Sequence, residues 1–268
     1  MRKASAFCPS YITGIFTIGK NDAAGAGFTI DSGMTTTVGE SRGMTKIIIN
    51  GSESAAPVSK AVLRKFSTLG KVGVVEIRHE TPLPIGFGLG MSAAGALSLS
   101  LALNELLGLG MKREECVKIA HDSDVECGTG LSGADASAIG GILVRRRIGE
   151  EVVRLPFEER QISLAFFSPM RNATVLKSKE WTSRVNAAGE AALDGVFAKK
   201  TWDSLVLESR KFATASLLAS WCSAEMAKNP RASMAMLGQT LFSDAPMEIP
   251  GVPGRMNANV CGEGAKAL

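Results

Sequence analysis

Two clusters of residues in this chain have the types and spacing that chemistry requires. The first is the stretch PIGFGLGMSAAG at residues 84–95, in which glycine occupies positions 86, 88 and 90. Glycine tolerates positive φ and lets the backbone approach a ligand closely. The stretch leads into residues 92–107, whose apolar composition predicts a helix, and a loop that ends at a helix N-terminus binds anions such as phosphate. This cluster predicts a nucleotide site.

Other glycine-rich motifs fit this stretch less well. A P-loop ends in Lys-Ser or Lys-Thr, whereas no lysine lies between Lys71 and Lys112. The loose dinucleotide pattern G-x-G-x-x-A is present, but residues 81–84 (TPLP) separate it from the preceding predicted strand, so we do not expect a Rossmann site. The stretch also lacks the last glycine of a nucleophile elbow. A loop that only packs tightly against its helix is the structural alternative.

The second cluster, DVECGTGLSGAD at residues 124–135, supplies carboxylates. Phosphoryl transfer needs a cation that bridges phosphate oxygens and a group that accepts or orients the proton of the nucleophile. Magnesium prefers oxygen ligands, which are available from the Ser92 hydroxyl and the carboxylate of Asp124 or Glu126. Asp135 is the candidate base, because the chain has only two histidines. A solvated helix end for Asp124 and Glu126, and a turn or cap role for Asp135, are the structural alternatives.

Together the two clusters resemble the motifs of the GHMP kinases. The ATP loop of that family has the form P-x-G-x-G-L-G-S-S-A, which residues 84–93 match except for Met91 at the first serine, and its S-G-x-D segment is matched by residues 132–135. The resemblance implies ATP and Mg²⁺ as cofactors, with Asp135 as the catalytic aspartate. It implies Ser92 and Asp124 as metal ligands, with Glu126 as the fallback for Asp124. The implied ATP contacts are Pro84, Gly86, Gly88, Leu89, Gly90, Met91, Ser92, Ala93 and Ala94.

Within this family the chain is most similar to the archaeal pantoate kinases, through residues 6–16, 129–131 with 140–145, 209–213 and 232–242. That resemblance implies phosphorylation of the primary hydroxyl of pantoate to 4-phosphopantoate, for coenzyme A synthesis. A carboxylate substrate needs cationic or N–H-rich contacts. We expect these from Tyr11, Thr13, Thr129 and Arg145, with a solvated strand end as the alternative for Arg145.

Two departures leave the acceptor open. Tyr11 stands where the pantoate kinases usually carry histidine and where mevalonate kinase-like members carry a lysine that assists catalysis. Extra residues also separate Leu131 from Asp135. The other hypotheses are a kinase for another hydroxy acid or alcohol, such as mevalonate or homoserine, and a non-catalytic nucleotide-binding regulator.

The composition narrows the class of protein. A net charge of +4 and an aromatic content of 6% give little support to nucleic-acid binding, so we expect no such partner. No apolar run reaches the length of a membrane span, and the N-terminal run lacks the features of a signal peptide. Five cysteines without a C-x-x-C pair predict free thiols in a reducing compartment. We therefore expect a cytoplasmic protein without a membrane partner, with a homodimer left open.

The elements that must position these residues alternate without a regular βαβ rhythm, which predicts an α+β fold. Strands are expected at 5–8, 12–18, 45–50, 72–79, 140–146, 162–167 and 239–242. Helices are expected at 57–66, 92–107, 112–126, 181–198, 202–219 and 226–237, and loops at 23–27, 128–138 and 244–259. Pro156 interrupts the apolar pattern, which indicates a boundary between two domains at 1–157 and 158–268. The family resemblance implies an N-terminal ATP-binding domain like domain 2 of ribosomal protein S5 and a ferredoxin-like C-terminal domain.

Overall fold

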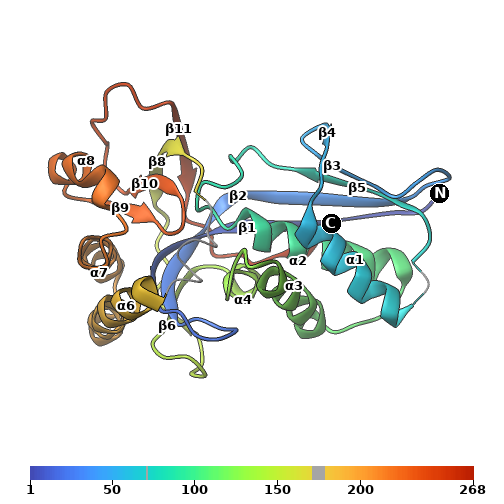
Figure 1. Cartoon of the computed structure of the whole chain (residues 1–268), viewed down its shortest axis with the longest axis horizontal. Helices are drawn as coiled ribbons and strands as arrows, with labels where there is room; N and C mark the ends of the chain where they lie inside the picture. The colour runs from blue at the N-terminus through green and yellow to red at the C-terminus, as the bar shows by residue number, and fades with distance from the viewer. Residues whose placement is uncertain (71, 171–178) are drawn as a thin grey trace.

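The structure, a computed structural model, describes residues 1–70, 72–170 and 179–268. Its strands form two sheets at opposite ends of an elongated molecule (Figure 1). The first sheet contains β1 (Lys3–Phe16), β2 (Gly25–Glu40), β3 (Lys46–Ile49), β4 (Ser52–Glu53), β5 (Val75–Glu80), β6 (Ile142–Arg145), β7 (Val153–Arg154) and β12 (Lys266–Ala267). The second contains β8 (Gln161–Ser168), β9 (Ala232–Ala235), β10 (Gln239–Ser243) and β11 (Gly254–Asn259).

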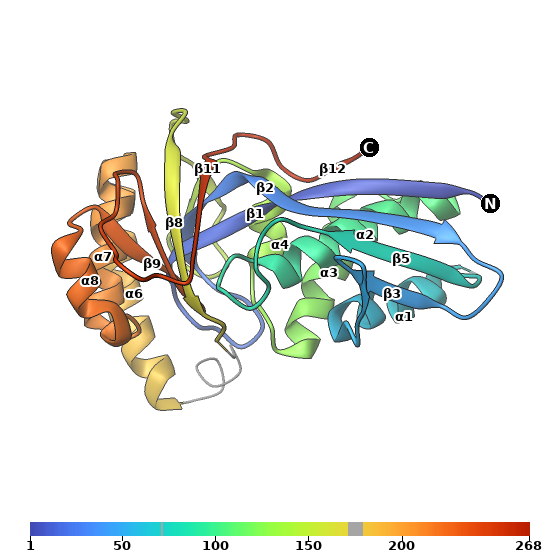
Figure 2. The same cartoon turned by 90° about the horizontal axis from the view of Figure 1, so that it is seen from above.

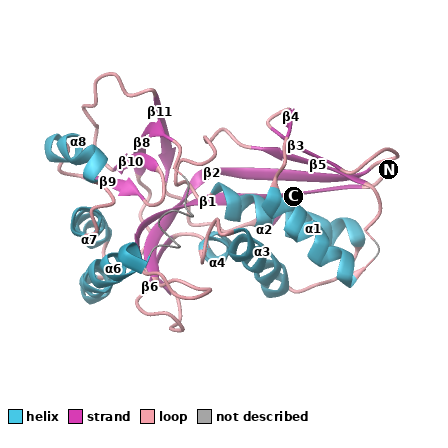
Figure 3. Ribbon diagram, in the orientation of Figure 1, coloured by secondary structure: helices cyan, strands magenta, loops and turns pink. Residues whose placement is uncertain are grey.

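Helices cover one face of the first sheet. They are α1 (Pro57–Leu69), α2 (Met91–Leu107), α3 (Arg113–Cys127) and α4 (Gly133–Ile139), and Figure 3 shows them together beneath the strands. Helix α2 lies nearest to the strands, with most of its side chains buried, which explains its apolar composition. Helices α1, α2 and α3 begin and end within three residues of the predicted bounds.

The first sheet has the order β12-β1-β2-β5-β3-β4, with β6 pairing with β2 and β7 with β6. Its core is the long antiparallel pair β1 and β2. The two strands predicted at 5–8 and 12–18 are parts of the single strand β1, so the break predicted between them is wrong: Pro9 and Gly14 do not interrupt β1. Pro9 and Gly14 lie instead at two shifts of register between β1 and β2. Bulges at these shifts accommodate the N–H that Pro9 lacks and the extra residue at Gly14. Most of the predicted loop at 23–27 is likewise the start of β2.

The second sheet has the order β11-β8-β10-β9, and all its pairs are antiparallel. Counted along the chain this is the 4-1-3-2 order of a ferredoxin-like fold, as expected. Helices α6 (Lys179–Lys199), α7 (Trp202–Ala215) and α8 (Ser223–Lys228), with the short 3₁₀ turn η1 (Ser220–Cys222), all precede β9. Figure 2 shows the three α-helices grouped at this end of the molecule. Residues 244–253 form a loop where a ferredoxin-like fold carries its second helix. The α+β prediction is confirmed.

Four further element predictions are wrong in whole or in part. The helix expected at 226–237 ends at Lys228, because Pro230 lacks an N–H and disfavours helical geometry at Asn229, and the chain then enters β9. Helix α7 ends at Ala215, before Leu217 takes a positive φ of 63°. The loop expected at 244–259 contains β11, and the loop expected at 128–138 contains α4.

The two halves are joined by apolar contacts and by one returning strand. Phe28 of β2 packs edge-on against Trp202 and Phe242, with ring centroids 5.0 and 5.3 Å away. Near the C-terminus, β12 pairs with β1, and Ala265 donates a backbone hydrogen bond of 3.0 Å to Ser137 of α4. The strands of the two sheets divide near residue 157, except that β12 belongs to the first sheet. The domain boundary at 157/158 therefore stays a prediction.

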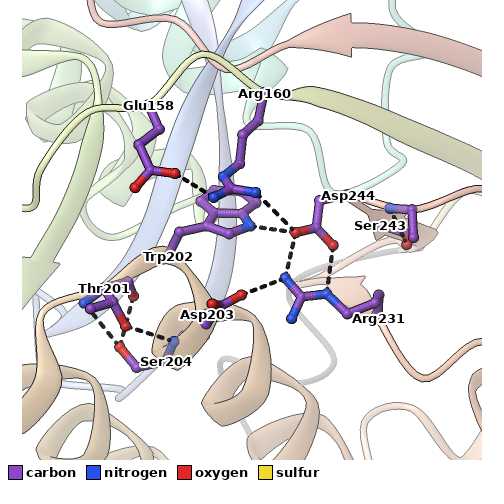
Figure 4. A network of polar contacts seen from close by, with 10 residues as sticks. Glu158, Arg160, Thr201, Trp202, Asp203, Ser204, Arg231, Ser243 and Asp244 are labelled. Carbon is purple, nitrogen blue, oxygen red and sulfur yellow. Dashed lines mark hydrogen bonds and ion pairs between the residues drawn. The ribbon is translucent and has the colours of Figure 1, made fainter.

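A polar network holds α7 against the second sheet (Figure 4). The Asp244 carboxylate, with a side chain only 5% exposed, accepts hydrogen bonds from Trp202 Nε1 at 2.7 Å and Arg231 Nε at 2.8 Å. Burial raises the pKa of Asp244, but these hydrogen bonds outweigh it and hold the pKa below its ordinary value. Arg231 also binds Asp203 at the start of α7. Among the described residues, no helix has the length and apolar character of a membrane span.

Candidate active site

The glycine-rich loop is held from behind and its glycines are needed for its path. Gly86, Gly88 and Gly90 have φ values of 87°, 79° and 65°, a region that other residues rarely adopt. The Ser10 hydroxyl donates to the carbonyl of Leu89, and the Thr240 hydroxyl donates to that of Phe87, both at 2.7 Å. The first-turn N–H groups of α2, which have no intrahelical acceptor, are left for a ligand.

The turn between β9 and β10 packs against this loop. A Cβ added to Gly88 would lie 2.7 Å from the backbone nitrogen of Gly238, and 2.8 Å from the carbonyl oxygen of Ala235. Met236 donates a backbone hydrogen bond of 2.9 Å to Thr13 of β1. The loop is therefore enclosed between β1 and a turn that comes from the other end of the chain.

A cavity of about 640 Å³, which we call the loop cavity, opens over this loop. It is lined by the N-termini of α1 and α2, by α3 and by the loop that follows α3. Pro84 and Ala94 are the only expected ATP contacts that do not line it. The predicted residues that do are Tyr11, Thr13, Gly86, Gly88, Leu89, Gly90, Met91, Ser92, Ala93, Asp124 and Thr129.

Asp124 is the only carboxylate among the described residues that line the loop cavity. Its side chain is buried, and the residue is 3% exposed. Burial raises its pKa, while hydrogen bonds from Thr129 and Ser92 oppose that rise. Asp124 and Ser92 thus place a carboxylate and a hydroxyl side by side at the N-terminus of α2.

The Ser92 hydroxyl and the Asp124 carboxylate form a pair of oxygen ligands. Such a pair suits Mg²⁺ better than it suits a metal ion that is held by protein side chains alone. Nowhere in the described ranges do three or more His, Cys, Asp or Glu side chains gather into a metal site. Magnesium usually keeps several waters and binds through one or two carboxylates together with substrate phosphates. Glu126, the alternative ligand, is exposed and ion-paired with Arg64 and Lys65 outside the cavity, so the geometry favours Asp124.

Asp135 and Arg145 lie in a neighbouring cavity of about 570 Å³, which we call the α3–α4 cavity. Asp135 Oδ2 is 3.3 Å from His121 Nδ1, and His121 Nε2 donates to the carbonyl of Asn21 at 3.1 Å. The hydrogen bond to Asp135 raises the pKa of His121, although partial burial opposes it. Arg145 pairs with Asp22 at 2.9 Å across the same cavity.

Helix α4 explains why Asp135 does not face the loop cavity. Ser132 and Gly133, at the start of α4, line that cavity, and Asp135 follows two residues later. Two residues correspond to a rotation of about 200° around a helix, which turns the carboxylate towards α3. The cavities are still neighbours, because His121 and Asp124 lie one turn apart on α3 and line one cavity each.

Sequence reasoning missed three parts of this site. It assigned no role to His121 or to the N-terminus of α1 at residues 55–59, and it named no contact for the turn at residues 236–238, which entered only through the family resemblance of residues 232–242. The spacing of His121 and Asp124, three residues apart on a predicted helix, was an available signal for the first. The other two depend on contacts between distant segments.

Comparisons with known proteins identify the family of this chain. Residues 56–141 match the model of the GHMP kinases N terminal domain. A pantoate kinase from Methanocaldococcus jannaschii is 30% identical over 251 residues, which cover 88% of this chain and 90% of that protein. A pantoate kinase from Methanospirillum hungatei is 29% identical, covering 91% and 88% respectively. A solved structure titled "Phosphotransferase related to CoA biosynthesis pathway" has a TM-score of 0.83 at 22% identity, covering 100% of this chain and 99% of its own.

Proposed function

This chain belongs to the GHMP kinase family, and from that premise we propose that it transfers the γ-phosphoryl group of ATP to the primary hydroxyl of pantoate. The observation that carries the proposal is the 30% identity to a pantoate kinase over nearly the whole of both chains. The neighbouring cavities support it, since one suits a triphosphate and the other carries an arginine for a carboxylate.

The loop cavity is the proposed ATP site. The glycine loop and the N-terminus of α2 would bind the phosphates through backbone N–H groups and the helix dipole. Ser92 and Asp124 would hold Mg²⁺, since they are the adjacent hydroxyl and carboxylate at that helix end. Bound there, the ion would supply positive charge that neutralises the charge developing on the phosphates during transfer.

The α3–α4 cavity is the proposed acceptor site. Arg145 would bind the substrate carboxylate, for which a guanidinium offers two parallel hydrogen bonds, in exchange for part of its pairing with Asp22. Asp135 would accept the proton of the attacking hydroxyl, and its contact with His121 keeps the carboxylate near α3. An acceptor that spans the two cavities would present its hydroxyl between Asp135 and the pair formed by Asp124 and Ser92.

The experiment that tests this function is ADP release from purified protein, with ATP and Mg²⁺, over a panel of pantoate, mevalonate and homoserine. The product is identified by ³¹P NMR. We expect the highest kcat/KM with pantoate and a phosphomonoester on its primary hydroxyl. A higher kcat/KM with mevalonate or homoserine would show that pantoate is not the preferred acceptor. No ADP release with any of the three would favour a non-catalytic nucleotide-binding regulator.

We also propose that the protein works in the cytoplasm. All five cysteines are free thiols, and three of them, Cys8, Cys116 and Cys222, are buried in the core. Proteins of oxidising compartments commonly use cysteine pairs as disulfides, whereas reducing compartments keep thiols free.

A further inference from the structure

A buried histidine that the proposed reaction does not use connects four elements beneath the loop cavity. His79 of β5 is 2% exposed. Its Nδ1 lies 2.7 Å from the hydroxyl of Thr36, the residue directly opposite on β2, and its Nε2 lies 3.0 Å from the hydroxyl of Ser59 on α1. The Thr36 hydroxyl lies 2.6 Å from that of Ser98 on α2. Ser98 donates to the carbonyl of Ala94, one turn earlier, at 2.8 Å.

The end of this chain of hydrogen bonds sets its direction. A carbonyl can only accept, so the single proton of Ser98 is used on Ala94, and Thr36 must donate to Ser98. The proton of Thr36 is then used, so His79 donates to it from Nδ1. Burial lowers the pKa of His79 to about 4, which leaves the ring neutral at pH 7 with Nε2 free to accept from Ser59.

The two ends of the chain lie at two helix N-termini that line the same cavity. Ser59 is in the first turn of α1, and Ala94 is in the first turn of α2. Neither helix has the side-chain N-cap that usually fixes such an end: the cap residues Ala56 and Gly90 make no side-chain hydrogen bond. The hydrogen-bond chain from Ser59 to Ala94 therefore ties together two ends that no cap holds.

We propose that His79 is a positioning residue: as the neutral, Nδ1-protonated ring at the centre of a one-directional hydrogen-bond chain, it sets the spacing of α1 and α2 where both contact the nucleotide. This inference rests on the proposed function, because it assigns the loop cavity to ATP. His79 does not contact the reacting groups. It acts through Ser59 on α1, and through Thr36 and Ser98 on α2.

The test compares two buried serines of α2. Ser98→Ala breaks the chain of hydrogen bonds between His79 and Ala94. Ser100→Ala instead removes a hydrogen bond of 2.9 Å to the carbonyl of Cys116, which lies away from the loop cavity. Both serines are fully buried, and each substitution removes one hydroxyl oxygen. A general loss of stability would therefore affect both variants. We expect the KM for ATP to rise about tenfold in Ser98→Ala and to stay unchanged in Ser100→Ala, with the KM for the acceptor unchanged in both. Equal KM values for ATP in the two variants would overturn the proposal.

Substitutions of His79 itself give a second readout. His79→Phe keeps a ring but loses both hydrogen bonds, so it should raise the KM for ATP as Ser98→Ala does. His79→Asn can still donate to Thr36 and should recover part of the loss. A purely structural role would lower the active fraction of both variants and leave their KM values alike.

The tautomer is measured directly by ¹⁵N NMR of the two ring nitrogens. The chain has only two histidines, so a His121→Gln sample assigns the signals. A neutral ring protonated at Nδ1 at pH 7 is expected, and a charged ring or one protonated at Nε2 would contradict the proposed direction. ATP dissociation constants from titration calorimetry repeat the serine comparison without turnover. If the wild-type protein binds ATP but phosphorylates none of the three acceptors, the proposed function is refuted, while the ATP dissociation constants still test the role of His79.

Discussion

Gly238 offers the sharpest test of how the glycine loop is held in place. It lies in the turn between β9 and β10, and a Cβ at this position would fall about 1 Å or more inside the 3.4 Å of ordinary contact with Phe87 and Gly88. The atoms it meets are backbone atoms, which cannot rotate away, and Gly238 has no positive φ of its own. In Gly238→Ala, either the turn or the loop must therefore move by about that distance.

A shift of this size in the loop proposed to bind the phosphates should have a large kinetic effect. Misplacing reacting groups by about 1 Å can lower a rate by about 100-fold, so we expect kcat/KM to fall by about that factor, or about 2.7 kcal/mol in activation free energy. The assay is coupled ADP release at saturating and limiting ATP, with urea unfolding to correct for folded fraction. Gly43→Ala is the control, because nothing lies within 4 Å of a Cβ there. A Gly238→Ala enzyme within about twofold of wild type would refute the reasoning.

The other predictions concern the two cavities and the network around Asp244. Asp135→Asn should abolish turnover while ATP still binds by calorimetry; near-normal turnover would remove Asp135 from its proposed role. Arg145→Gln should raise the KM for pantoate by about 10- to 100-fold, the value of a charge-assisted contact, and leave the KM for ATP unchanged. Arg231→Met should lower the free energy of unfolding in urea at pH 7 by about 2 kcal/mol, because a buried carboxylate loses its main partner. The folded-state pKa of Asp244 is below its ordinary value of 3.8, so this stabilisation is present above pH 4 and is lost as the pH falls through the folded-state pKa. The difference between Arg231→Met and wild type should therefore shrink in acid, and a constant difference would contradict the assignment.

Local patterns were enough to predict the glycine loop and the helix that follows it. The glycines at 86, 88 and 90 and the apolar helix after them form one continuous segment, so their arrangement depends on residues near in sequence. The place of Asp124 near the end of a helix was likewise predictable, because the amphipathic pattern at 112–126 defines that helix. Features of this kind follow from short-range sterics and from the N–H groups that any helix start exposes.

The orientation of Asp135 could not be predicted in the same way. Residues 128–138 are mostly small and show no hydrophobic period, so nothing in them indicated a helix. The start of α4 at Gly133 is imposed by packing, since Gly133 approaches Ala93 of α2 too closely for a larger residue. Because the start of a helix sets where each later side chain points, a loop and a helix give different answers for Asp135.

The strand β12 has a consequence for how the protein is made. Residues 264 and 265 pack against α4, the helix that carries Asp135, and β12 pairs with β1, which is synthesised long before it. A ribosome therefore releases the N-terminal sheet long before it releases the segment that supports α4. Until then, the growing chain has its glycine loop but lacks the segment that packs against α4. This side of the fold is complete only once residues 264–267 have left the exit tunnel.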